Sequence, residues 1–272
     1  MKTSKSKQVH SIAHKAFRSK LKRKKIIILF CQIILLVIFF AAWELAVQSR
    51  VLEAFIFSSP TRMWSMFVNM LASGELIHHI RITMYAVFVS FGIGTAIGII
   101  ISILLWWNSF AQKVLDPYLI IFNSLPKTAL APIIIVWLGN NMQAIIATSL
   151  LISVVVTVLN VLTGFRQVDQ DKLKLARSFG AKKHQEMLKV VFPASVPDVV
   201  NAIKINIGLT FVGVIVGEFL VAGSGLGFLI VYGSQIFRMD MVMLSILILC
   251  LMAAFFYLLI SFIEKRFARW AE

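Results

Sequence analysis

Two ionisable residues interrupt long apolar stretches of this 272-residue chain. Lys127 follows Pro126 in "LIIFNSLPKTALAPIIIVWLG", and Glu218 lies in "LTFVGVIVGEFLVAGSG". A charge at the centre of a lipid bilayer costs at least about 2.5–3.5 kcal/mol, so each side chain should face a partner or a water-filled path. Pro126 and Pro132 leave backbone carbonyls unpaired, which is tolerated where they line a cavity. We therefore expect Asn123, Pro126, Lys127 and Glu218 to border a path through the membrane, where a lysine would favour an anionic solute.

The same two charges allow a second interpretation. Lys127 and Glu218 could form an ion pair that fixes the packing of two spans without touching a solute. The residue pattern disfavours a membrane-embedded enzyme, because no histidine falls inside a predicted span to complete a catalytic set. An ion-coupled secondary transporter or a channel is the other alternative, and it would be expected to show internal repeats or coupled carboxylates. Cys31 and Cys250 lie in apolar runs, so neither a metal site nor a cofactor site is expected.

The composition requires a membrane protein. The chain is 59% hydrophobic and 14% charged, with a mean hydropathy of +0.88, which is too apolar for a soluble domain. Several apolar runs reach the roughly 20 residues that a membrane helix needs, so the predicted fold class is all-α, a polytopic helix bundle of about six spans. Glycine pairs four residues apart, Gly94 with Gly98 and Gly213 with Gly217, should let these helices approach closely. The predicted spans are 26–48, 82–107, 117–138, 143–163, 203–222 and 241–263.

The distribution of basic residues predicts the orientation. An even number of spans places both termini on one side, and 22 of the 27 Lys and Arg residues lie on that side. The opposite side carries Arg50, Arg62, Arg81 and Arg238, and Lys127 lies within the third span. The positive-inside rule therefore places both termini in the cytoplasm. The ten basic residues of 1–25 suit anionic lipid headgroups, and we expect no nucleic acid as a partner.

A polar segment, residues 164–200, separates the fourth and fifth predicted spans. Asp169 is placed to cap a first helix, and Gly180 stands where a helix commonly ends in a left-handed residue. Leu173, Ala176 and Gly180 form one strip, which we expect to face outward as a docking surface. An ordinary solvated loop fits the same pattern.

A second helix is expected over about 182–192. Glu186 lies within reach of Lys182 and Lys189, and Pro193 should stop the helix. Two short helices with a glycine hinge, attached to a span at either end, would transmit a displacement to those spans as a unit.

The stretch "ARSFGAKKHQEMLKVVFP" resembles the EAA loop of permease subunits of bacterial ABC importers. The pattern of that loop is Glu-Ala-Ala, three residues, Gly, nine residues and Ile-x-Leu-Pro, and its spacing is kept here. Lys174 and Leu175 replace the Glu and the first Ala of the pattern. The resemblance extends over about residues 55–265, where "LDPYLIIFNSLPKTALAPIIIVWLG" and "VGEFLVAGSGLGFLI" are similar to the nitrate, sulfonate and taurine subgroup. The positions that match the coupling loop are Lys174, Leu175, Ala176, Gly180, Ala181, Val190 and Pro193.

The resemblance implies a type I importer permease in a bacterial plasma membrane. Its partners would be two ATPase subunits, a second permease copy and an extracellular or periplasmic solute-binding protein. The chain has no Gly-Lys dipeptide and hence no P-loop, so ATP and magnesium would be bound by the ATPase. Nitrate, a sulfonate, taurine or a pyrimidine-type precursor would all suit the subgroup. The expected parts are a basic cytoplasmic tail (1–25), a first span with the start of an outer loop (26–54), the permease domain (55–265) with its coupling loop (164–200), and a C-terminal tail (266–272).

Overall fold

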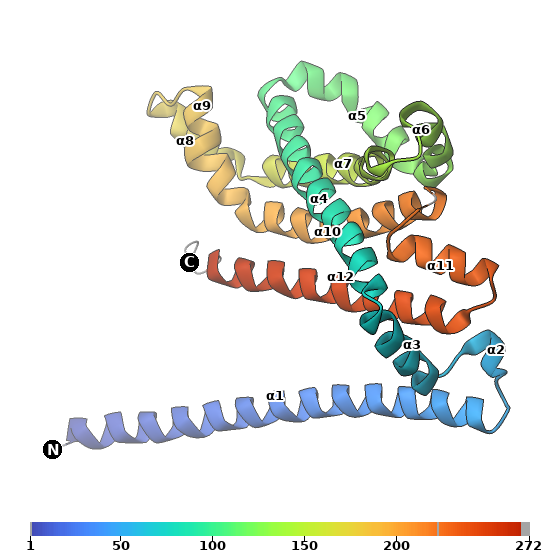
Figure 1. Cartoon of the computed structure of the whole chain (residues 1–272). Coiled ribbons are helices and arrows are strands. Elements are labelled where there is room, and N and C mark those ends of the chain that lie inside the picture. The colour runs from blue at the N-terminus through green and yellow to red at the C-terminus, as the bar shows by residue number, and fades with distance from the viewer. Residues whose placement is uncertain (1, 222, 268–272) are drawn as a thin grey trace. The chain divides into compact units, whose positions relative to one another are not determined.

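A computed structural model describes residues 2–221 and 223–267, and every regular element in these ranges is a helix (Figure 1). The predicted all-α class is therefore confirmed, while most of the predicted tail 266–272 lies outside the described residues. The chain divides into two compact units, Met1–Trp64 and Ser65–Glu272. In chain order the elements are α1 (Lys2–Gln48), α2 (Ala54–Phe57), α3 (Pro60–Ala72), α4 (Glu75–Trp107), α5 (Ser109–Ser124), the 3-10 helix η1 (Lys127–Leu130), α6 (Ala131–Leu138), α7 (Met142–Gln167), α8 (Gln170–Ser178), α9 (Lys183–Glu186), the π-helix η2 (Met187–Val191), α10 (Phe192–Leu220), α11 (Leu226–Gln235) and α12 (Met239–Phe267).

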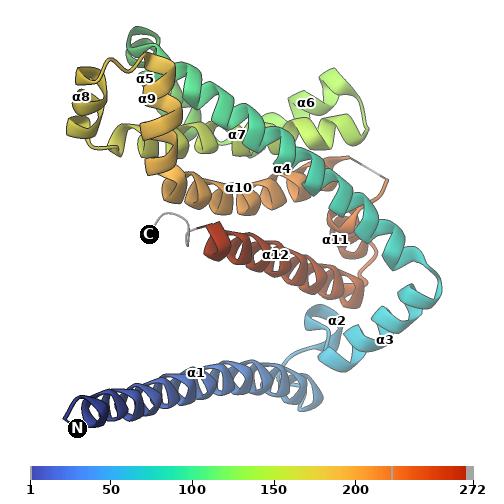
Figure 2. The ribbon, with the colours of Figure 1, turned by 90° about the vertical axis from the view of Figure 1, so that its left-hand side faces the viewer.

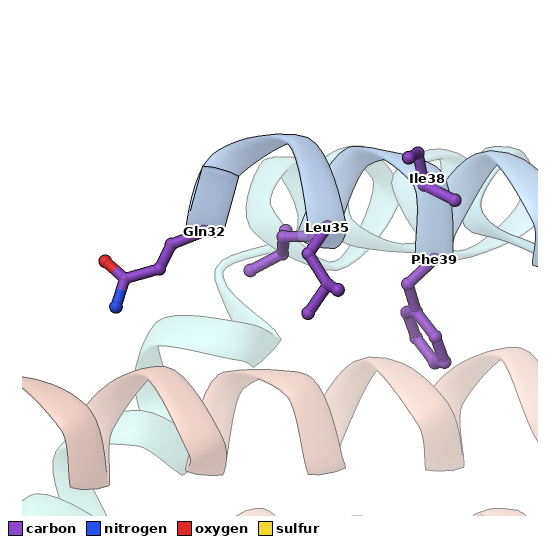
Figure 3. Close-up of a pocket in the computed structure, with 5 residues that line it drawn as sticks. Gln32, Leu35, Ile38 and Phe39 are labelled. Atoms are coloured by element: carbon purple, nitrogen blue, oxygen red, sulfur yellow. The ribbon is translucent and has the colours of Figure 1, made fainter. Parts of the chain in front are cut away.

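The first unit consists of one long helix and a short return. The apolar part of α1, Ile26–Gln48, has the length and hydropathy of a membrane span. A hollow against this helix is lined by residues of α1 itself, so it marks an uncovered apolar face rather than a solute pocket (Figure 3). The carboxylate of Glu44 accepts hydrogen bonds from the backbone nitrogen of Thr61 at 3.1 Å and from its hydroxyl at 2.8 Å. These bonds join the end of α1 to the beginning of α3.

Small residues set the packing of α4, α7 and α10 in the second unit. A Cβ atom added to Gly98 of α4 would lie 2.5 Å from Cγ2 of Thr157 of α7. A Cβ atom added to Gly213 of α10 would lie 2.5 Å from the backbone Cα of Ser149, also of α7. Non-bonded carbon atoms do not approach so closely, so these contacts require glycine. The predicted close approach of helices at the two glycine pairs is confirmed.

The predicted third span is broken. The chain is extended at Leu125, and the helical stretch Lys127–Leu138 is bent by 83° from Ser109–Ser124. Pro126 accounts for the break, because its ring disfavours a helical conformation at the preceding residue and it has no N–H to donate. Within the described residues, five helices are long and apolar enough to cross a bilayer, and this bent pair makes up to six.

The helix expected to stop at Pro193 continues instead. α9, η2 and α10 follow one another without a gap, so the fifth predicted span is part of a helical stretch from Lys183 to Leu220. Pro193 lies in the first turn of α10. Its ring would clash with the carbonyl four residues earlier in a regular helix, and the wider turn of η2 immediately before it relieves that clash. The prediction of a stop at Pro193 was wrong because it assumed a regular α-helix on its N-terminal side.

The two ends of α10 carry different structures (Figure 2). The hairpin formed by α8 and α9 lies at its N-terminal end, and α11 follows its C-terminal end. α11 and α12 share a buried apolar cluster with the first turns of α4, which includes Leu76, Leu226, Leu229 and Leu244. A movement of the α8–α9 hairpin can therefore reach α11 along a single helix.

Two glycines of α10 provide a test of the tight packing. We expect Gly213→Ala to destabilise the protein by about 1–3 kcal/mol, because the new methyl group overpacks against the backbone of α7. Gly208→Ala is the matched control, since a Cβ atom there meets no atom within 4 Å. Thermal unfolding in detergent should show a lower Tm for Gly213→Ala and an unchanged or higher Tm for Gly208→Ala. Equal Tm values would contradict the packing described above.

Candidate functional site

The α8–α9 hairpin stands on a buried apolar base. Phe165, Leu173, Met187 and Val191 belong to one cluster with less than a tenth of each side chain exposed. Leu173 therefore faces inward, so the expected outward strip through this residue was wrong. The hairpin therefore packs on α7 and α10 through this buried cluster, which an ordinary solvated loop would lack.

Apolar side chains also lie on the exposed side of the hairpin. Leu175 of α8 is 58% exposed, Phe179 directly after α8 81%, and Leu188 of η2 67%, on a segment that carries several lysines. The N-terminus of α8 is capped by Asp169, whose carboxylate accepts a hydrogen bond from the backbone nitrogen of Asp171 at 2.8 Å. Gly180 has φ +79°, the left-handed conformation expected of it. Large apolar groups exposed on a rigid, capped element are typical of a surface that another protein covers.

An ion pair closes the hairpin across the glycine. Arg177 Nε donates to Glu186 Oε1 at 2.9 Å, and Arg177 Nη2 donates to Glu186 Oε2 at 3.0 Å. Only 4% of Glu186 is exposed, whereas Arg177 is largely exposed. The hydrogen bond to Glu186 raises the pKa of Arg177, so its charge is retained. The partner of Glu186 is thus an arginine from the other helix, and the sequence-based expectation of Lys182 or Lys189 missed it.

The remaining residues of the predicted coupling loop are distributed over the hairpin, η2 and the first turn of α10. Lys174 is exposed, and its Nζ atom donates to Asp171 Oδ1 at 3.0 Å. The lysine that replaces the acid of the EAA pattern therefore has a carboxylate neighbour on its own helix. Ala176, Ala181 and Val190 are half-buried, and Gly180 and Pro193 are exposed.

Lys127 lies at the break between α5 and α6. It is the first residue of η1 and is half-exposed, and Asn123 and Pro126 beside it are exposed. Its Nζ atom lies 3.4 Å from Oδ1 of Asn123. The structure therefore brings three of the predicted path residues together on an accessible surface of the bundle.

Glu218 lies elsewhere and is fully buried, with 0% of its surface exposed. Its Oε1 atom accepts a hydrogen bond from the hydroxyl of Thr83 at 2.8 Å, and its Oε2 atom accepts one from the backbone nitrogen of Gly227 at 2.7 Å. Both carboxylate oxygens thus have partners other than Lys127, whose amino group contacts Asn123. Lys127 and Glu218 therefore do not form an ion pair, and the alternative interpretation was wrong.

His79 lies within α4, because this helix begins at Glu75 and not at residue 82, where the predicted span that excluded every histidine begins. It is 6% exposed, and its Nδ1 atom accepts a hydrogen bond from the backbone nitrogen of Gly225 at 3.0 Å. Its spacing of four from Thr83, on the same face of α4, is the signal that could have indicated a shared role.

Comparison with known proteins identifies a family for slightly less than two thirds of the chain. Residues 94–272 match the family model described as "Binding-protein-dependent transport system inner membrane component". The chain is 26% identical over 230 residues to the putative aliphatic sulfonates transport permease protein SsuC of Bacillus subtilis, covering 85% of this chain and 83% of that protein. It is 24% identical over 186 residues to the formylaminopyrimidine transport permease protein ThiX of Halalkalibacterium halodurans, covering 68% of this chain and 74% of that protein.

Solved structures share the fold. A chain from inward-facing conformations of the MetNI methionine ABC transporter superposes with a TM-score of 0.61 at 23% identity. The similarity covers 72% of this chain and 96% of that chain. A chain of an amino acid ABC transporter superposes with the same TM-score at 20% identity, covering 74% of this chain and 98% of that one. The type I importer permease fold is therefore confirmed.

The ion pair in the hairpin can be tested by limited proteolysis. We expect Arg177→Gln to release α8 from α9, because it leaves the buried carboxylate of Glu186 without its partner. Trypsin cleavage at Lys182 and Lys183 should then become roughly three- to tenfold faster, since cleavage follows the population of the opened hairpin. Lys172→Gln removes a charge from the same helix and should leave the rate unchanged. Equal rates in the two variants would show that the ion pair does not hold the hairpin closed.

Proposed function

The chain belongs to the family of binding-protein-dependent transport system inner membrane components, and from this premise we propose how its parts serve transport. It is the membrane-spanning permease subunit of an ATP-driven importer and not an enzyme, because ATP hydrolysis in such systems takes place on a separate subunit. This assignment replaces the two alternatives, an ion-coupled transporter or channel and a membrane-embedded enzyme. Its partners include an ATPase and a solute-binding protein.

We propose that the α8–α9 hairpin is the surface that meets the ATPase. The observation that supports this most directly is the exposure of Leu175, Phe179 and Leu188 on an element whose base is buried. Lys174, Gly180 and the other predicted coupling residues shape the same hairpin. Since α8 follows α7 and α9 leads into α10, a push on this surface moves two spans together.

The solute path is proposed to lie between two copies of the chain. At Gly98 and Gly213, α4 and α10 each pack so closely on α7 that a methyl group would not fit, so the space between these helices does not suit a solute path. Lys127, Asn123 and Pro126 instead lie on the accessible surface of the broken span. A path past these residues has to be closed by another surface, and a second copy would place two such lysines around it.

We propose an anionic solute, most simply an aliphatic sulfonate. The support comes from the accessible lysine of η1 and from the similarity to the SsuC permeases. Glu218 does not border this accessible surface, because it is 0% exposed and both of its oxygens accept hydrogen bonds within the bundle. A single amino group attracts an anion without enclosing it, which suits a path from which the solute must also leave.

The orientation and remaining partners are part of the same proposal. Both termini and the α8–α9 hairpin would face the cytoplasm, with two ATPase subunits on that side and the binding protein on the other. ATP and magnesium would be bound by the ATPase, and this chain would carry no cofactor of its own. The basic residues of 1–25 would lie against anionic lipid headgroups.

The docking surface can be tested by assembly. We expect Phe179→Ala combined with Leu188→Ala to weaken binding of the ATPase at least about tenfold, because large exposed apolar groups commonly dominate such interfaces. Leu251→Ala is the control, since Leu251 is 62% exposed but lies within the long span of α12. Co-purification and titration of the ATPase against the permease in nanodiscs would measure the effect. Undiminished binding by the double variant would place the interface elsewhere.

The role of Lys127 can be tested by uptake in proteoliposomes that contain the permease, its ATPase and its binding protein. We expect Lys127→Met to lower ethanesulfonate uptake roughly tenfold and Lys127→Arg to retain most of it, because the positive charge attracts the anion. Lys113→Met removes an exposed lysine from the other end of α5 and should have little effect. Unchanged uptake by Lys127→Met would remove this lysine from the path. Uptake of neutral formylaminopyrimidine in place of the sulfonate would contradict the proposed solute but not the transport role.

A further inference from the structure

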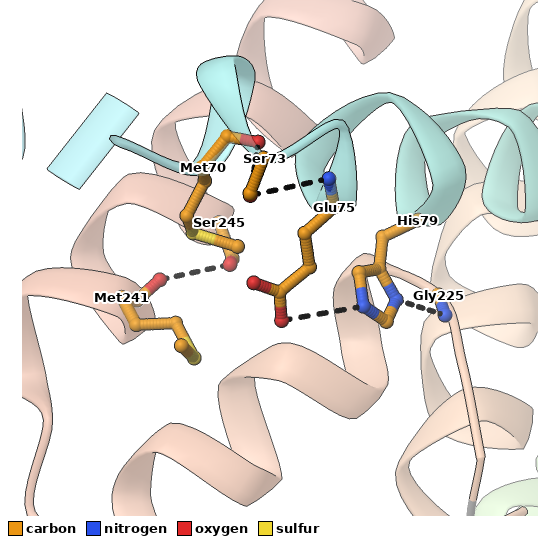
Figure 4. Close-up of polar contacts among 7 residues, drawn as sticks. All are labelled: Met70, Ser73, Glu75, His79, Gly225, Met241 and Ser245. Atoms are coloured by element: carbon orange, nitrogen blue, oxygen red, sulfur yellow. Dashed lines mark hydrogen bonds and ion pairs between the residues drawn. The ribbon is translucent and has the colours of Figure 1, made fainter. Parts of the chain in front are cut away.

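The turn between α10 and α11 is held by side chains from two other parts of the bundle. Three successive backbone N–H groups at the beginning of α11 have no partner within their own helix, as in any helix. The N–H of Gly225 donates to Nδ1 of His79 at 3.0 Å, and the N–H of Leu226 donates to Oγ1 of Thr83 at 2.8 Å. The N–H of Gly227 donates to Oε2 of Glu218 at 2.7 Å. Figure 4 shows His79 of α4 directed at Gly225, with Glu75 on the other side of the ring.

Thr83 links these contacts into one network. Its hydroxyl accepts from Leu226 and donates to Oε1 of Glu218, so one side chain of α4 joins α10 to α11. Thr83 and Glu218 are both 0% exposed. The N-terminus of α11, the positive end of its helix dipole, faces the carboxyl group of Glu218, and no cationic side chain among the described residues pairs with it.

The turn and the carboxylate fit each other sterically. A Cβ atom added to Gly225 would lie 2.3 Å from Cδ of Glu218, and the φ of Gly225, +111°, is itself unfavourable for other residues. A Cβ atom added to Gly227 would lie 2.8 Å from Cβ of Glu218. The glycines of "GSGLG" therefore allow the backbone to close around an acid supplied by the protein.

Apolar contacts extend the attachment along α11. The ring of Phe228 stacks on His79 with centroids 6.0 Å apart, and Tyr232 stacks on Phe228 at 5.5 Å. Leu226 and Leu229 are buried with Leu76 of α4. α11 is thus fixed to α4 by a polar network at its beginning and by an apolar face along its length.

Building on the proposed transport role, we infer that Glu218, acting through Thr83, is a positioning residue that makes α11 part of one rigid body with α4 and α10. This body extends along the 29 residues of α10, from the coupling hairpin to the opposite end of the bundle. α11 is then not a separate lid over the path. Access at that end changes when the whole body moves relative to the second copy, while Glu218 takes no part in binding the solute.

The inference can be tested by distances in the assembled complex with its ATPase. Spin labels at Ile77 of α4 and Gln235 of α11, both exposed, would report their separation by pulsed electron paramagnetic resonance after Cys31 and Cys250 are replaced by serine. We expect one narrow distance distribution that is the same without nucleotide and with ATP and vanadate. A shift between these two states in a complex that hydrolyses ATP would overturn the inference. Failure of the unlabelled permease to assemble with any ATPase would instead overturn the proposed function.

A matched pair of substitutions tests the hydroxyl of Thr83. Thr83→Val keeps the shape but removes both hydrogen bonds, and Thr83→Ser keeps the hydroxyl. We expect Thr83→Val to broaden the distance distribution and to raise the population of detached α11 about tenfold, since hydrogen bonds to charged groups are among the stronger ones. Thr83→Ser should resemble the parent protein. Identical distributions in the two variants would contradict the positioning role.

Chemical rescue tests the carboxylate itself. Glu218→Ala should broaden the distribution and reduce ATP hydrolysis stimulated by the binding protein, and added sodium formate should restore both by occupying the vacated position at the α11 N-terminus. Formamide has a similar size but no charge and should not restore them. Equal rescue by formamide would show that the side chain only fills space, and a Glu218→Ala variant with an unchanged distribution would exclude the inference altogether.

Discussion

The structure depends on one constraint: a polar group that enters the lipid-exposed part of the chain must find its partner inside the protein. Glu218 meets it with a threonine hydroxyl and the backbone of a neighbouring helix. The hydroxyl of Ser102 meets it by donating to the carbonyl of Gly98 in its own helix, at 2.7 Å. Asn206 of α10 donates to Thr95 of α4 at 2.8 Å. The contacts of Glu218 and Asn206 fall between α4, α10 and α11, so the same constraint that removes polar groups from lipid also specifies which helices are neighbours.

Lys127 does not enter the interior of the bundle, so it needs no buried partner. Among the described residues its amino group lies at hydrogen-bonding distance from Asn123 alone, and both residues lie on the accessible side of a broken span. The interior of the second unit serves to hold its helices together. Its contacts are made by buried glycines, hydroxyl groups and the capped N-terminus of α11. The accessible polar residues of the broken span lie on its surface, as the proposed path between two copies requires.

Much of this organisation could be predicted from the sequence. Hydropathy was sufficient to predict the all-α class and most spans, because an uninterrupted run of about 20 apolar residues is typical of a helix that crosses a membrane. Spacing alone located the hairpin, its cap at Asp169 and its left-handed Gly180. Two local predictions failed at Pro126 and Pro193, because a proline breaks, bends or begins a helix depending on the turn before it. The partners of Glu218 and Glu186 could not be predicted, since they are 135 and nine residues away and depend on how helices pack.

The π-helix η2 has a consequence for how the sequence of such a protein can change. Its five residues complete a turn that an ordinary α-helix completes with fewer, so it stores extra length between the hairpin and α10. Deleting a single residue there would let the segment close as a regular α-helical turn, and the wide turn before Pro193 would be lost. The ring of Pro193 would then meet the carbonyl four residues earlier. A deletion in η2 should therefore destabilise the protein more than a substitution of an exposed residue in the same segment.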